Sequence, residues 1–141
     1  MSDIKFTPNQ AALDRLLRAR GGPVDTYMAS VADQVVAEAK IEAPEHTVTP
    51  TSKGRPGELK RSIHRLPTRR HGYRVIASTF YAYFVHEGTK PHIIVPKPTN
   101  RSGKLRFYWD KEGGIVFRGK VRHPGTKPDR FLLRALHKVI R

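Results

Sequence analysis

Hydrophobic residues recur at helical spacing near both ends of the chain. From Pro23 onward they return every three or four positions, which predicts an amphipathic helix of about 20 residues that Pro44 ends. A shorter helix is predicted to run from Thr7, which suits an N-cap, to about Arg20. A third apolar stripe predicts a C-terminal helix over about 129–140.

Between these helical regions the pattern favours strands, with alternating, β-branched and aromatic residues. The segments with this pattern are SIHRLP (62–67), YRVIAST (73–79), FYAYFVHEGT (80–89), HIIVP (92–96), KLRFYWD (104–110) and GIVFRGKV (114–121). No helix is predicted between successive strands, so the connections are hairpins. The order predicts an α+β fold with two N-terminal helices, an antiparallel β-meander sheet and a C-terminal helix packed on the sheet.

A length of 141 residues fits a single domain over 1–141. The expected division is a helical region at 1–45, a loop with a short helical turn at 46–62, an antiparallel sheet at 63–122 with an extended loop near 89–103, and the C-terminal helix at 128–141. The long polar loop that begins at residue 45 is of the kind that carries function or moves.

Charge is high and uneven along the chain. The net charge is +15, but residues 1–45 carry −2 and the remainder +17. Such a field attracts nucleic acid, acidic protein surfaces or anionic lipid. The chain has no cysteine, which excludes disulfides, thiolate nucleophiles and cysteine-ligated metals. It has no apolar run of about 20 residues and no signal-peptide pattern, so we expect a soluble protein made in the cytoplasm, with no membrane partner.

Two similar segments stand out, His86-Glu87-Gly88-Thr89 and His123-Pro124-Gly125-Thr126. A zinc-protease motif needs its second histidine four residues after the first on one helix, whereas His92 follows His86 by six, with Gly88 and Pro91 between. We therefore expect no metal and no cofactor. Glycine, proline and threonine instead favour sharp exits from strands, and the residues predicted to form these structural turns are Gly88, Thr89, Pro124, Gly125 and Thr126.

Evidence for catalysis is weak, so we expect a protein that is not an enzyme. No G-x-S-x-G elbow occurs, and acidic residues are scarce in the predicted sheet. A basic nuclease using histidine with lysine or arginine stays an alternative, as does non-specific nucleic-acid binding beside the aromatic run 107–109. The candidate contacts to a partner protein or to DNA are exposed-loop cations, namely Lys53, Arg55, Arg61, Arg69, Arg70, Lys90, Lys97 and Arg101.

Four segments, taken in order, resemble one known family. They are PGELKRSI (56–63), YAYFVHEGT (81–89), GKLRFYW (103–109) and VRHPGTKPDRFLLRAL (121–136). The chain resembles the small tail-completion, or head–tail joining, proteins of long-tailed double-stranded DNA bacteriophages. It departs from their pattern at Asp129-Arg130, where a small residue and proline are common, so the motif does not set where the last helix begins.

The resemblance implies a structural virion protein at the neck, between the DNA-filled head and the tail, made in the host cytoplasm. It implies a ring of identical copies in contact with other neck, connector and tail proteins. Basic loops would meet acidic faces of those proteins, which we favour, or touch genomic DNA non-specifically in the channel. A tail-terminator ring protein of similar size and fold is the nearest alternative.

Overall fold

The computed structural model describes residues 7–45, 55–69 and 72–141. The elements in chain order are α1 (Gln10–Arg18), α2 (Pro23–Glu42), α3 (Glu58–Ser62), β1 (Ile63–Pro67), β2 (Tyr73–Ala77), α4 (Ala82–Glu87), β3 (His92–Ile94), β4 (Leu105–Trp109), the 3-10 helix η1 (Asp110–Glu112), β5 (Gly114–Arg118), β6 (Val121–His123) and α5 (Phe131–Val139). Helices and antiparallel strands together confirm the predicted α+β class.

The two N-terminal helices lie close to their predicted positions. Helix α2 has 20 residues, with Pro23 at its first position, and it ends just before Pro44. Helix α1 starts later than expected, because the capping residue is Asn9 rather than Thr7. The side-chain oxygen of Asn9 accepts a hydrogen bond from the Ala12 N–H at 3.1 Å, which satisfies one of the free amides of the first turn.

The core lies where α2, α5, α3 and the β1–β2 hairpin meet. Phe131 of α5 and Ile63 of β1 are its largest fully buried side chains. Ala39 of α2 and Ala135 of α5 are also fully buried, and such small residues let two helices approach closely. The C-terminal helix therefore packs on α2 and shares one core with the hairpin, and we call this unit the body.

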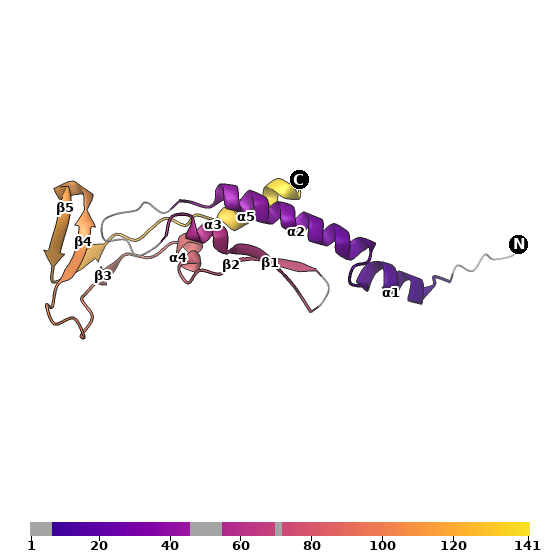
Figure 1. The fold of residues 1–141 in the computed structure, drawn as a ribbon, viewed down its shortest axis with the longest axis horizontal. Coiled ribbons are helices and arrows are strands. Elements are labelled where there is room, and N and C mark those ends of the chain that lie inside the picture. Colours follow the sequence, from indigo (N-terminus) through magenta and orange to yellow (C-terminus); the bar gives the residue numbers. More distant parts are fainter. Residues whose placement is uncertain (1–6, 46–54, 70–71) are drawn as a thin grey trace, which may run out of the picture.

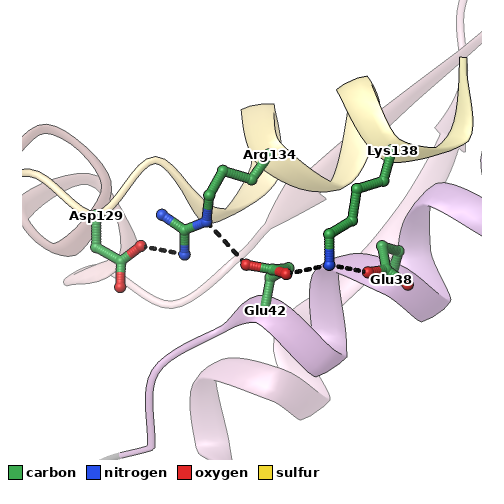
Figure 2. A network of polar contacts seen from close by, with 5 residues as sticks. All are labelled: Glu38, Glu42, Asp129, Arg134 and Lys138. Carbon is green, nitrogen blue, oxygen red and sulfur yellow. Dashed lines mark hydrogen bonds and ion pairs between the residues drawn. The ribbon is translucent and has the colours of Figure 1, made fainter. Parts of the chain in front are cut away.

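Ion pairs reinforce the contact between α2 and α5 along its edge (Figure 2). Arg134 donates to Glu42 at 2.8 Å and pairs with Asp129 at 2.6 Å. Lys138 bridges Glu38, at 2.6 Å, and Glu42. The hydrogen bond from Lys138, and then that from Arg134, lowers the pKa of Glu42. The hydrogen bonds to Glu38 and then to Glu42 raise the pKa of Lys138.

The strands do not form the single meander that we predicted. They form three two-stranded antiparallel sheets in the described residues, β1–β2, β3–β6 and β4–β5. The predicted hairpins β1–β2 and β4–β5 are confirmed. However, β3 pairs with β6, with the whole β4–β5 ribbon between them in sequence. The sequence pattern missed this nested pairing because alternation reports that a strand exists and not which strand it pairs with.

The predicted strand at 80–89 was wrong, because residues 82–87 form helix α4. The residues of this segment that pack on the core are Tyr81, Ala82 and Val85, which have helical spacing. The aromatic residues that suggested a strand remain at the surface, including Phe80 and Phe84. Short apolar runs are ambiguous in this way.

Figure 1 shows an elongated molecule with the body in the middle. Helix α1 extends from one end, and the ribbons β3–β6 and β4–β5 project from the other. We call residues 88–127 the arm. The chain exposes 11598 Å², whereas a compact protein of 16.0 kDa would expose roughly 7,400 Å².

Candidate functional site

The two His-x-Gly-Thr segments meet at the base of the arm. The N–H of Thr89 donates to the carbonyl of Thr126 at 3.0 Å, and the N–H of Thr126 donates to the carbonyl of Thr89 at 3.1 Å. The two threonine hydroxyls lie 3.0 Å apart. The repeated motif is therefore two halves of one structure, in which each half supplies the backbone partners of the other.

The glycines make this crossing sterically feasible. Gly88 has φ 72° and Gly125 has φ 87°, a conformation that favours glycine. A Cβ on Gly88 would lie 2.5 Å from the carbonyl oxygen of Thr126, and one on Gly125 would overlap the carbonyl oxygen of Thr89. The predicted turn residues Gly88, Thr89, Gly125 and Thr126 thus come together in one place, with Pro124 beside Gly125.

Three histidines near the crossing make contacts that orient the chain. The rings of His92 and His123, opposite each other on β3 and β6, lie 5.1 Å apart. His123 Nδ1 accepts from the N–H of Gly125 at 3.0 Å, and His92 Nδ1 lies 2.8 Å from the carbonyl of Lys90. His86 contacts Glu87 and the edge of Phe131. Within 7–45, 55–69 and 72–141, no group of three or more potential metal ligands comes together.

The predicted contact cations do not form one site. Lys53 and Arg70 lie outside the described residues. Arg55 and Arg61 are exposed at helix α3, and Arg69 is exposed near the end of the β1–β2 hairpin. Lys90, Lys97 and Arg101 are exposed on the arm. Three of the predicted contact cations are therefore carried by the same projecting part of the molecule, the arm.

The sequence analysis singled out the aromatic run 107–109, but not the basic cavity on the arm that this run helps to line. This cavity has a volume of about 600 Å³ and lies against β4, β5 and β6. Its cationic lining residues are Lys111, Arg118, Lys120 and Arg122. The Arg118 guanidinium lies 5.7 Å from the centre of the Trp109 ring and pairs with Glu112 at 2.7 Å. The run of cations in RGKVRH (118–123) was the sequence feature that pointed to a basic site. That these cations line one cavity with Trp109 follows from the strand pairing, which the sequence does not show.

An apolar groove on the body was also missed. It has a volume of about 470 Å³ and runs between α2, β2 and α5. Its lining includes Met28, Val31, Tyr73, Leu136 and Ile140. Met28, Leu136 and Ile140 are exposed, so the sequence correctly placed them on apolar helix faces but gave no sign that those faces stay open.

The fold and this site define an α+β protein with a helical body and a projecting basic arm. No protein-family model, curated protein or solved structure matches the chain. None of the helices in the described part of the chain is long and apolar enough to cross a membrane.

Proposed function

We propose that this chain is a structural virion protein of the neck of a long-tailed bacteriophage, which completes the tail and joins it to the DNA-filled head as a subunit of a ring. The proposal rests first on the four ordered segments that resemble the tail-completion family. Its form, a body with an arm that exposes much apolar surface, suits a subunit that is completed by neighbours.

The observation that carries the proposal is the pairing of Thr89 with Thr126. These residues belong to YAYFVHEGT and VRHPGTKPDRFLLRAL, two of the four segments of the resemblance. The two segments form the base of the arm only by pairing with each other, so there is a structural reason for both to occur in one chain. The proposal needs these segments to have a common structural role, and building the base of the arm is such a role.

The proposed role is not catalytic. Thr89, Thr126 and His123 use their hydrogen-bonding atoms to hold the chain crossing. A nuclease assay tests the rival interpretation, with His86, His123 and Arg122 each replaced by alanine. Turnover by the native protein that these replacements abolish, while the fold survives, would support the basic nuclease instead.

Acidic faces of neighbouring neck and tail proteins are the proposed target of the basic arm, in preference to DNA. Strong contacts to DNA phosphates would hinder a genome that must slide through the channel. Such contacts would also make DNA binding depend steeply on salt. Titration with salt separates the two targets. We expect docking to connector or tail components at low salt that weakens as salt rises, and little duplex binding at physiological salt. Duplex binding without docking would reverse the preference.

Electron microscopy of phage particles assembled without the protein tests the function. The proposal predicts filled heads and finished tails that remain separate. Tails of uncontrolled length would indicate the tail-terminator ring, and normal joined virions would refute both. The coding sequences on either side provide a second check, since portal, capsid and tail-tube proteins are expected there.

A further inference from the structure

The basic cavity on the arm lies between the β4–β5 ribbon and β6. Strand register and alternation place Phe107, Trp109 and Arg118 on one face of the ribbon. Val116, on the same face, is buried, so this face is turned toward the rest of the arm. Phe107 and Val121 of β6 line the cavity together. The cavity is therefore held between two sheets, β4–β5 and β3–β6.

The inward face of the ribbon offers flat surfaces on which a planar group can stack. The Arg118 guanidinium lies 5.7 Å from the centre of the Trp109 ring, and the centre of the Phe107 ring lies 6.3 Å from that of Trp109. Trp109 nevertheless stays 37% exposed. Unpaired nucleic-acid bases stack on aromatic rings and on guanidinium planes. An exposed indole beside a guanidinium therefore suits a base.

The cavity also carries cations that no carboxylate neutralises within the described residues. Arg118 pairs with Glu112 at 2.7 Å. Lys111, Lys120 and Arg122, in contrast, are exposed and form no ion pair with any residue that the structure describes. Residues 104–123, which include β4, β5 and β6, contain six basic and two acidic residues, a net charge of +4. Uncompensated cations around a hollow attract an anionic ligand.

Stacking surfaces and uncompensated cations together fit a nucleotide, which joins a planar base to a phosphate. The volume of about 600 Å³ lies within the range of roughly 300–1,000 Å³ that is usual for ligand sites. A base inside a duplex is covered on both faces by its neighbours, so only an unpaired base can lie against Trp109. An acidic peptide would satisfy the cations, but its carboxylates make no use of the exposed ring. The cavity therefore favours single-stranded nucleic acid over a duplex or an acidic peptide.

The cavity is separate from the cations proposed to meet acidic partner proteins. Lys90, Lys97 and Arg101 are not among the described residues that line it. The argument against strong contacts to the duplex genome does not apply here, because a duplex presents no free base face. The inference therefore goes beyond the proposed function and does not depend on the ring or on its partners.

We infer that the cavity of the arm binds single-stranded nucleic acid. One base stacks on Trp109 beside Arg118. The adjoining phosphates lie against the three uncompensated cations, Lys111, Lys120 and Arg122. Stacking accepts any base, so binding is tolerant of sequence.

Fluorescence tests the inference at the site itself, because Trp109 is the only tryptophan of the chain. The native protein is titrated with unlabelled oligothymidylate of about 12 nucleotides at physiological salt. We expect quenching of the Trp109 emission that saturates, since a stacked base lies against the indole. A duplex of the same length is expected to bind at least ~tenfold more weakly and to leave the emission unchanged.

Paired charge removals separate the cavity from the general charge of the arm. Lys120→Ala/Arg122→Ala should weaken oligothymidylate binding about tenfold. Lys97→Ala/Arg101→Ala removes the same charge from the arm outside the cavity, and should weaken binding no more than about twofold. All four side chains are exposed, so both variants are expected to fold, and circular dichroism checks this.

The stacking contribution is measured with Trp109→Leu, by the fluorescence anisotropy of a fluorescein-labelled oligothymidylate. We expect affinity to fall at least ~fivefold. Phe117→Leu is the matched control, because Phe117 is 54% exposed and lies on the other face of the same ribbon. Its affinity for the oligothymidylate should be unchanged.

Four results would overturn the inference. A lack of saturable oligothymidylate binding, or equal losses in the two paired variants, would remove the site. Equal affinity for the duplex would mean that the arm binds phosphate charge and not bases. A short polyglutamate peptide that quenches Trp109 and displaces the oligothymidylate would assign the cavity to an acidic peptide. The joining of heads to tails is tested separately, so each of these results would leave the proposed function standing.

Discussion

At the scale of single residues, the account depends on two glycines and two threonines. Gly88 and Gly125 each combine a positive φ with an approach to a carbonyl of the other segment. Thr89 and Thr126 then exchange backbone hydrogen bonds. The identical Gly-Thr pairs in the two segments are therefore explained by geometry, because each segment meets the same steric demand from the other.

Replacing Gly88 or Gly125 by alanine is expected to destabilise the protein strongly. The positive φ alone costs about 1–2 kcal/mol, and overlap with a carbonyl adds to it. Gly103→Ala is the matched control, since Gly103 has φ 59° but open space around it. Urea unfolding measures the three variants. A Gly88→Ala variant that lost no more stability than Gly103→Ala would contradict the crossing.

Two threonine replacements should have different effects on stability. Thr126→Val removes a hydroxyl that lies 3.0 Å from that of Thr89, and is expected to cost about 0.5–1.5 kcal/mol. Thr79 Oγ1 is buried with no hydrogen-bond partner among the described residues, so Thr79→Val is expected to be neutral or stabilising. Thermal unfolding of both variants checks the prediction. Equal losses would show that the hydroxyl contact at the crossing contributes nothing of its own.

At the scale of elements, the body is held by α2 and α5, and their edge contains a pH-dependent cluster. The pKa of Glu42 is lowered below its ordinary value of 4.5, first by Lys138 and then by Arg134. A depressed carboxylate pKa contributes stability above pH 4.5, and this contribution is lost as the pH falls through the folded-state pKa.

Glu42→Gln should therefore lower the free energy of unfolding near pH 7, and the difference from the native protein should shrink on acidification below pH 4.5. Urea titrations at several pH values measure it. Lys138→Met provides the control, because Glu42→Gln should have a smaller effect once the hydrogen bond from Lys138 is absent. A difference that stayed constant with pH would exclude an ionised Glu42 in this cluster.

The sequence predicted elements better than their pairing. Some elements depend on local signals, such as proline positions, hydrophobic spacing and hairpin turns. These elements are helix α2, with Pro23 at its start and Pro44 after its end, and the hairpins β1–β2 and β4–β5. The pairing of β3 with β6 and the helix at 82–87 depend on which residues meet in space. The turn residues of the candidate site were predicted, but their contact was not, because nothing in either Gly-Thr pair specifies its distant partner.

At the scale of the whole molecule, the arm makes the protein longer than its size requires. A compact chain of this length has a radius of gyration of roughly 14 Å. Small-angle X-ray scattering, under dilute conditions where the mass is that of one chain, is expected to give a clearly larger value. A value near the compact one would mean that the arm folds onto the body, and would remove the projecting surface on which assembly depends.

The proposed place of this protein is the joint between head and tail. The most direct test is to locate it in intact particles, by electron microscopy of virions labelled with an antibody to the chain. The account predicts label at the neck, between a filled head and a completed tail. Label on the capsid surface or along the tail, or purified virions that contain none of the protein, would contradict it.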